Sequence, residues 1–378
     1  MKGFATSTRL RSSLGPALLA LAAVLLSAGS GTAPATTTSF AVPRVLWSVP
    51  MQGWVGASPV LGPGHTVLLV DARGVAMLVD AASGRPAWSY DLGDRLLYTP
   101  AVSGDTLLIA RVGELAVLDK QGHPRWIKAT GVAPVLSPAI ARDGTVYAAD
   151  GPLLYAVRSD GKERWQYQTA SFYSGSPVIA HDGTVYIGAK SILMALDPQG
   201  RQKWFYRADS TLYASPAIDA AGNLYLGTGH GIVSLDAAGR VRWTHAGAAT
   251  ETTPLVGADG RIYAGDVAGR FTALSASGQV IWSRKLGQSI GASAALARGS
   301  IYVGTGDGRL HALDLAGNEQ WAVQLGGGAV FGAPMIGPDG HVYVGAGRTY
   351  FALDTGSPLA EAPWPLARQD PSAQGRAP

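Results

Sequence analysis

Positively charged and aromatic side chains recur at fixed phases of an approximately 39-residue period along the 378-residue chain. One set lies between the second and third apolar segments of the repeats and comprises Arg73, Arg111, Lys190, His230, Arg270, Arg309 and Arg348. A second set precedes the first apolar segment and comprises Tyr98, Tyr173, Tyr213 and Phe331. If the repeats close into a ring, both sets would surround one mouth. There they could hold an anionic ligand, or a loop or strand of a protein partner.

Five acidic residues share these connecting segments and nearly cancel the positive charge: Asp71, Glu114, Asp150, Asp266 and Asp307. A solvated surface of mixed charge is therefore the alternative interpretation of the whole set. The two interpretations differ in whether a ligand or partner covers the segments.

Other kinds of reactive site are not indicated by the sequence. The chain contains no Cys, which excludes a thiolate metal site, a cysteine nucleophile and a disulfide. Its seven His residues fall at different phases of the period, and no pair has metal-ligand spacing. A nucleophile elbow, a phosphate loop and a calcium loop are also missing from the sequence. We therefore predict no catalytic residue and no metal site.

Eight tryptophans set the period that positions all these residues. They are Trp47, Trp88, Trp126, Trp165, Trp204, Trp243, Trp282 and Trp321, and all but the first follow a short strand and a Gly-containing turn, as in Ala195–Trp204. A fixed period of this length indicates a solenoid, a propeller or another repeat array. Such a set could be a stacking platform for sugars or bases. One Trp per repeat beside a Gly turn is better explained by packing between neighbouring repeats, so we predict a structural docking role.

Each repeat has the pattern of four short strands. The first follows a Pro in most repeats, as in Ser137-Pro138-Ala139-Ile140, and an Asp-Gly pair such as Asp143-Gly144 comes next. Asp-Gly predicts a type I′ hairpin with positive φ at both central residues. The middle strands are apolar on both faces, which requires a neighbour on each side. Eight repeats thus predict one all-β domain, an eight-bladed β-propeller of four-stranded antiparallel blades.

Closure of the ring is predicted from the two ends of the repeat region. Trp47 lies in an apolar strand with no repeat in front of it, and the eighth repeat stops at Asp354 without a Trp of its own. We expect the N-terminal strand that carries Trp47 to complete blade eight. Trp364, in a Pro-rich stretch, is the rival candidate for that place.

The N-terminal residues predict secretion. Lys2, Arg9 and Arg11 precede an apolar run over residues 14–26, followed by small residues, which is the order of a signal peptide. The predicted organisation is a signal peptide at 1–35, a lead-in linker at 36–44, the propeller at 45–356 and a tail at 357–378. Residues 1–35 hold three of the 30 basic residues and none of the 26 acidic ones, so the remainder is near neutral and nucleic-acid binding is not favoured. We expect a periplasmic or secreted monomer without a transmembrane span after signal cleavage, a retained anchor being the alternative.

The repeat resembles that of the quinoprotein-like (PQQ-like repeat) β-propellers, whose blades carry a Trp-docking motif of the type Ala-x-Asp-x-x-x-Gly-x-x-x-Trp. Leu78–Trp88 has the full spacing, with Leu in place of Ala. Other repeats have a turn one residue shorter, and Val157–Gly161 lacks the usual Asp. The resemblance covers about residues 45–356.

Two branches of that family imply different functions. The BamB branch, similar in length and blade number, implies a non-catalytic scaffold that binds protein partners of the envelope or the outer-membrane assembly machinery, without a cofactor. BamB proteins are normally lipoproteins, and no Cys follows the apolar run of this chain. The dehydrogenase branch implies the alternative, a quinoprotein oxidoreductase with pyrroloquinoline quinone and calcium on the propeller axis. A lesser alternative is extracellular nucleic-acid or polysaccharide binding.

Overall fold

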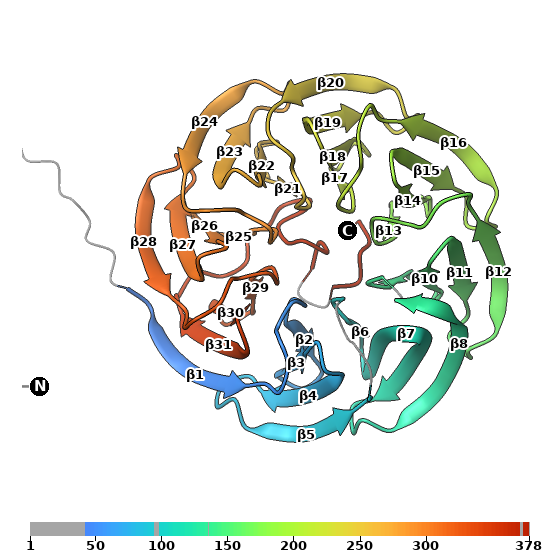
Figure 1. Cartoon of the computed structure of the whole chain (residues 1–378), viewed down its shortest axis with the longest axis horizontal. Helices are drawn as coiled ribbons and strands as arrows, with labels where there is room; N and C mark the ends of the chain where they lie inside the picture. The colour runs from blue at the N-terminus through green and yellow to red at the C-terminus, as the bar shows by residue number, and fades with distance from the viewer. Residues whose placement is uncertain (1–41, 94–97, 135, 371–372, 378) are drawn as a thin grey trace, which may run out of the picture. The chain divides into compact units, whose positions relative to one another are not determined.

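The computed structural model describes residues 42–93, 98–134, 136–370 and 373–377. The predicted signal peptide, and the predicted lead-in linker up to residue 41, lie outside these residues. The described ranges fold into eight antiparallel sheets arranged as the blades of a ring (Figure 1). The predicted eight-bladed β-propeller is confirmed. No helical segment in these ranges has the length and hydropathy needed to cross a membrane.

The first four blades follow one another along the chain, each running outward from an inner strand. Their strands are β2 (Val60–Gly62), β3 (Thr66–Val70), β4 (Val75–Asp80) and β5 (Pro86–Asp91) in blade one; β6 (Ala101–Ser103), β7 (Thr106–Asp119) and β8 (Pro124–Pro134) in blade two; β9 (Ala139–Ile140), β10 (Val146–Asp150), β11 (Leu153–Val157) and β12 (Glu163–Gln168) in blade three; and β13 (Val178–Ile179), β14 (Val185–Ala189), β15 (Ile192–Leu196) and β16 (Gln202–Arg207) in blade four.

Blades five to eight repeat this order, except that blade eight takes its outer strand from the N-terminus. Their strands are β17 (Ala217–Ile218), β18 (Leu224–Thr228), β19 (Gly231–Leu235) and β20 (Val241–Ala246) in blade five; β21 (Leu255–Val256), β22 (Ile262–Gly265), β23 (Arg270–Leu274) and β24 (Val280–Lys285) in blade six; β25 (Ala295–Ala297), β26 (Ser300–Gly304), β27 (Arg309–Asp314) and β28 (Glu319–Gln324) in blade seven; and β29 (Met335–Ile336), β30 (His341–Ala346), β31 (Thr349–Asp354) and β1 (Arg44–Pro50) in blade eight.

Blade two has three strands because one long strand, β7, occupies two strand positions. The first half of β7 pairs with β6, and its second half pairs with β8. β7 therefore supplies both the second and the third strand of an ordinary blade.

Burial along the strands explains why the sheets stack radially. All five residues of β14 are buried, whereas those of the outermost strand β16 are intermediate or exposed. A strand that is apolar on both faces must be covered on both faces, and the two neighbouring blades provide that cover. The outermost strands form the rim of the ring, where one side faces water.

The Asp-Gly turns differ from the predicted type I′ geometry. Gly144 has a φ of 80°, but Asp143 is not among the four non-glycine residues of the described ranges that have a positive φ. Its carboxylate accepts the backbone N–H of Thr145 at 2.9 Å. This bond holds Asp143 in an ordinary conformation and leaves the left-handed position to Gly144, as in the three-residue hairpin loops that end on a glycine.

The N-terminal strand closes the ring. β1 pairs antiparallel with β31, with Arg44 opposite Asp354 and Pro50 opposite Thr349. This confirms Trp47, and not Trp364, as the tryptophan of blade eight. β1 begins at Arg44, the last residue of the predicted lead-in.

Tryptophan docking joins the blades along the rim. In the described ranges, seven indole Nε1 groups donate to a backbone carbonyl of the next blade at 2.8–3.1 Å: Trp47 to Ala81, Trp88 to Lys120, Trp126 to Ser159, Trp165 to Pro198, Trp204 to Ala237, Trp243 to Ala276 and Trp282 to Leu315. A turn glycine of the next blade packs under each of these rings, as Gly200 does under Trp165. The geometry is that of the predicted structural role.

The C-terminal tail crosses the middle of the ring, as the red trace in Figure 1 shows. Its backbone pairs with inner strands of several blades, through the bridges Leu359 to Ala297, Trp364 to Val256 and Arg376 to Ile179. Trp364 is fully buried there, among the inner strands of blades four to six. The tail thus connects blades that are distant in sequence and fills the axial hole.

Candidate functional site

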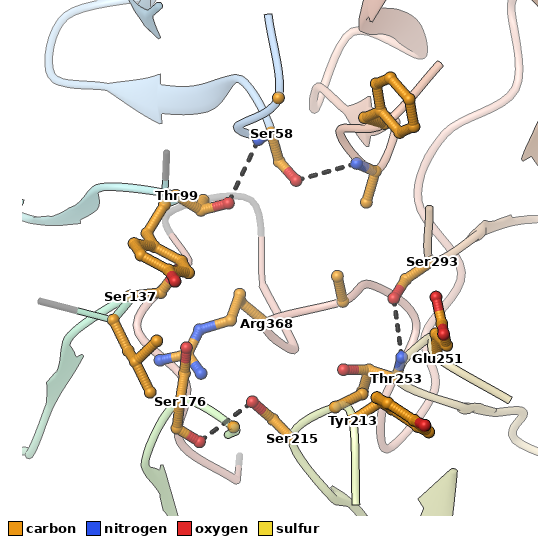
Figure 2. Close-up of a pocket in the computed structure, with 18 of the residues that line it drawn as sticks. Ser58, Thr99, Ser137, Ser176, Tyr213, Ser215, Glu251, Thr253, Ser293 and Arg368 are labelled. Atoms are coloured by element: carbon orange, nitrogen blue, oxygen red, sulfur yellow. Dashed lines mark hydrogen bonds between the residues drawn. The ribbon is translucent and has the colours of Figure 1, made fainter. Parts of the chain in front are cut away.

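An axial pocket of about 290 Å³ opens where the inner strands begin. Each blade contributes the residue at the same position of its repeat to the wall, and seven of the eight carry a hydroxyl group: Ser58, Thr99, Ser137, Ser176, Ser215, Thr253 and Ser293, with Ala333 in blade eight. Figure 2 shows this ring of short side chains around the opening. Because each precedes the first strand of its blade, the propeller symmetry brings them together.

Several of these hydroxyls link neighbouring blades. Ser293 Oγ accepts the backbone N–H of Thr253 at 2.9 Å, and Thr99 Oγ1 accepts that of Ser58 at 3.2 Å (Figure 2). Ser58 Oγ accepts the backbone N–H of Ala333 at 3.0 Å, across the closure of the ring. In these three bonds, the hydroxyl oxygens satisfy backbone donors of an adjacent blade.

Arg368 of the tail forms part of the floor of the pocket. Its guanidinium donates to the carbonyls of Pro138 at 2.8 Å and Pro177 at 3.1 Å, and Figure 2 shows the side chain directed toward Ser137 and Ser176. Burial lowers the pKa of Arg368 to about 10, against the opposing effect of Asp370. The group is therefore cationic at neutral pH, and it ties the tail to blades three and four.

Aromatic side chains surround the mouth of the pocket. Three of the four predicted rings, Tyr98, Tyr213 and Phe331, line the pocket. Tyr173 does not, because it is buried beside its own blade, where burial raises the pKa of its phenol. The position in the repeat thus predicted which segments surround the mouth of the pocket. It did not distinguish aromatic rings that face the opening from one that packs inward.

The predicted cations lie on the same face, farther from the axis. Backbone bonds from Met51 to the Arg348 carbonyl and from Leu212 to the Lys190 carbonyl, both 2.8 Å, fix these turns against the segments between blades. We call the surface formed by the segments between blades and the turns between second and third strands the loop face. None of the seven predicted cations, Arg73, Arg111, Lys190, His230, Arg270, Arg309 and Arg348, lines the axial pocket. The second and third strands lie outside the first, so their connecting turn stands back from the axis.

Three features of this site were not identified from the sequence. Trp54 and Phe172 are exposed rings on segments of the loop face, with 57% and 66% of their surface accessible. The hydroxyl ring was visible in principle as a Ser or Thr before the first strand of almost every repeat. Arg368 had no such signal, because the tail does not share the period of the repeats.

The lining residues do not fit calcium with a quinone tricarboxylate. Calcium takes six to eight oxygen ligands, usually with several carboxylates, whereas Glu251 supplies the one carboxylate among the lining residues that the structure describes. In the described ranges, no group of three acidic or His residues is placed to hold a metal ion. Arg368, the one cation among the described lining residues, already donates to two carbonyls.

The chain was compared with known proteins. A family model described as outer membrane protein assembly factor BamB matches residues 41–140, 113–256 and 246–370. No curated protein matches.

Two solved structures share the fold. BamB from Moraxella catarrhalis has a TM-score of 0.71 at 19% identity, over 83% of this chain and 100% of that chain. The computationally designed Ika8 protein has a TM-score of 0.72 at 16% identity, over 82% of this chain and 99% of that chain. At these identities the structures show the fold, whereas the family model spans most of the sequence. The chain therefore belongs to the PQQ-like repeat β-propeller family described as outer membrane protein assembly factor BamB.

Proposed function

We propose that the protein is a non-catalytic scaffold of the cell envelope that binds protein partners through its loop face. The family description, outer membrane protein assembly factor, suggests the process: the assembly of outer-membrane proteins or a similar envelope role. The order of charged, apolar and small residues in 1–35 supports export of the chain.

One observation carries the proposal, the gathering of exposed aromatic rings around the mouth of the axial pocket. Tyr213 and Phe331 line the opening and are 43% and 54% exposed, and Trp54 and Phe172 stand on the same face. Large aromatic side chains are the usual anchors of protein interfaces, since they bury much apolar surface at little cost in side-chain entropy. Exposed apolar side chains elsewhere, such as Phe205 and the adjacent pair Val280 and Ile281, lie on outer strands away from the pocket.

Site-specific photo-cross-linking in cells that secrete the full chain tests this proposal. A photoreactive residue is placed at Tyr213 or Phe331 on the loop face, and at Phe205 or Val280 on the rim as matched exposed controls. We expect discrete adducts with an envelope protein from the loop face alone. Adducts that form only from the rim, or from neither surface, would refute the scaffold role of this face.

The quinoprotein alternative is tested separately by titrating the mature chain with pyrroloquinoline quinone, with and without calcium. Tryptophan fluorescence and quinone absorbance report binding. We expect no saturable change, because the described part of the lining offers one carboxylate and a cation already engaged with carbonyls. Saturable micromolar binding would instead favour the quinone-binding alternative.

A further inference from the structure

Four exposed arginines occupy equivalent turns of four consecutive blades on the loop face. Arg270, Arg309, Arg348 and Arg73 belong to blades six, seven, eight and one, and we call them the arginine arc. In the described ranges none of them forms an ion pair. By contrast, the cations of blades two and five are paired, Arg111 with Glu114 and His230 with Asp209.

Carboxylates near the arc are engaged in local bonds. Asp71 is buried and accepts the backbone N–H groups of Gly53, Arg73 and Val75. Asp266 accepts the backbone N–H of Arg270 at 2.8 Å, and Asp307 accepts the hydroxyl of Thr305 at 2.5 Å. Two guanidinium groups of the arc also donate within the protein, Arg348 to the carbonyl of Gln52 and Arg309 Nε to Gln324 Oε1 at 3.4 Å. These acceptors are neutral, so within the described ranges the positive charges of the arc have no ion-pair partner and remain available to an acidic ligand.

An exposed indole belongs to the segment that joins the last two blades of this arc, blades eight and one. The carbonyl of Trp54 accepts the backbone N–H of Ala72, next to Arg73, at 2.8 Å. The following residue, Val55, donates to the carbonyl of Gly347, next to Arg348, at 2.9 Å. The backbone of residues 54 and 55 is therefore held between the turns that carry Arg73 and Arg348. The Trp54 ring lies beside Gly328, with 57% of the residue's surface accessible.

Resting on the proposed scaffold function, we infer that the arginine arc and Trp54 bind a short acidic segment of a protein partner that carries an aromatic or large apolar side chain. A guanidinium group can donate two parallel hydrogen bonds to a carboxylate. An exposed indole beside such groups can pack against an apolar side chain of the same segment. A long nucleic acid is disfavoured because the opposite side of the loop face presents exposed Asp209 and Glu251.

Selection from a displayed library of random peptides on the mature full chain tests the inference. Peptides enriched on the wild type should combine Asp or Glu with an aromatic residue. The double variant Arg309→Gln/Arg348→Gln should lose this enrichment. The control double variant Arg85→Gln/Arg142→Gln should retain it, because both of its arginines are exposed and lie on turns of the opposite face.

An enriched peptide, synthesised and measured by fluorescence anisotropy, should bind the arc variant about fivefold more weakly than the wild type. Its affinity should also fall when salt rises from about 0.1 M to about 1 M, where the Debye length shortens from about 10 Å to about 3 Å. Trp54→Ala should remove the preference for an aromatic residue and keep that for acidic residues.

Three results would overturn the inference: no acidic enrichment, enrichment that Arg309→Gln/Arg348→Gln leaves unchanged, or tighter binding of an oligodeoxythymidylate or of phosphatidylglycerol vesicles than of the peptide. If apolar peptides bind and their binding depends on Tyr213 but not on Arg309, the inference of an acidic partner segment is wrong. The proposed scaffold function is then still supported. If the loop face gives no cross-links in cells, the scaffold itself fails.

Discussion

The indole Nε1 of Trp47 donates a hydrogen bond to the backbone carbonyl of Ala81 at 2.8 Å. Trp47 is on the N-terminal strand, which completes blade eight, and Ala81 lies in blade one. The ring also packs on Gly84, whose ideal Cβ position lies 2.8 Å from the indole. Among the described residues, the junction at which the ring closes therefore uses the same contact as six of the seven junctions between blades that are consecutive in sequence.

Replacing Trp47 should weaken this closure. Trp47→Phe loses one hydrogen bond and should lower the free energy of unfolding by about 1 kcal/mol, whereas Trp47→Ala should lower it by about 3–5 kcal/mol. Urea titration measures both. Trp321→Phe is the matched control, because in the described ranges its indole has no carbonyl acceptor and Gly356 has no atom near its Cβ position. Equal losses for Trp47→Phe and Trp321→Phe would contradict the role of the hydrogen bond.

Alanine substitutions at two glycines distinguish the cost of backbone strain from the cost of a steric clash with tryptophan. Gly239 and Gly222 have φ values of 81° and 80°. The Cβ of Gly239→Ala would lie 2.7 Å from the Trp204 ring, but that of Gly222→Ala would lie 3.5 Å from Ala237 Cβ. Both variants incur left-handed strain of about 1–2 kcal/mol, and Gly239→Ala should lose about 1–3 kcal/mol more through the clash. Similar melting temperatures for the two variants would contradict this expectation.

Trp364 fills the axial hole with its indole N–H unsatisfied. The side chain is fully buried, and Nε1 has no hydrogen-bond partner among the described residues. Trp364→Ala should lose about 3–5 kcal/mol of stability through the cavity. Trp364→Phe removes a buried donor that costs about 1–3 kcal/mol when unpaired, so it should be far milder. Denaturant unfolding would refute this account if the two variants were equally unstable.

Alkaline pH should destabilise the propeller through its buried tyrosines. Burial raises the pKa of Tyr186 and of Tyr225 to about 12, compared with about 10 for tyrosine in an unfolded chain. The folded pKa values are the higher ones. The stabilisation is therefore complete below pH about 10 and is lost as the pH rises through about 12.

Tyr186→Phe tests this dependence, since it removes one titrating group and retains the ring that packs on Trp204 at 5.6 Å. Unfolding free energies between pH 9 and pH 12 should fall less steeply in the variant. Identical slopes in variant and wild type would exclude Tyr186 as a contributor.

Most of the fold could be predicted because the repeats share one pattern of strands and packing residues. The spacing of Trp165, Trp204 and Trp243 fixed the period, and one strand type per phase followed from it. The sequence around Trp47 and around Trp364 did not show which of the two completes blade eight. Both are tryptophans outside a complete repeat, and strand pairing with β31 over a separation of 310 positions decides between them.

The residues of the candidate site could be predicted only where they occupy a regular position of the repeat. Tyr213 and Phe331 share a phase and reach the axial pocket, whereas Arg309 also has a regular phase but lies farther out. Distance from the axis depends on the order of strands within a blade, and a one-dimensional period does not encode it. Arg368 and Trp54 lie on irregular segments, and their positions depend on contacts with remote blades.

The pairing of β1 with β31 also bears on biogenesis. During synthesis the first strand of the ring emerges long before its partner, and until blade eight exists it offers an open edge to any other strand. The tail can enter the axial hole only after the surrounding blades have formed. A prematurely terminated chain therefore has two unpaired edges and an unfilled centre, so it should associate with its own copies and depend on chaperones in the compartment where it folds.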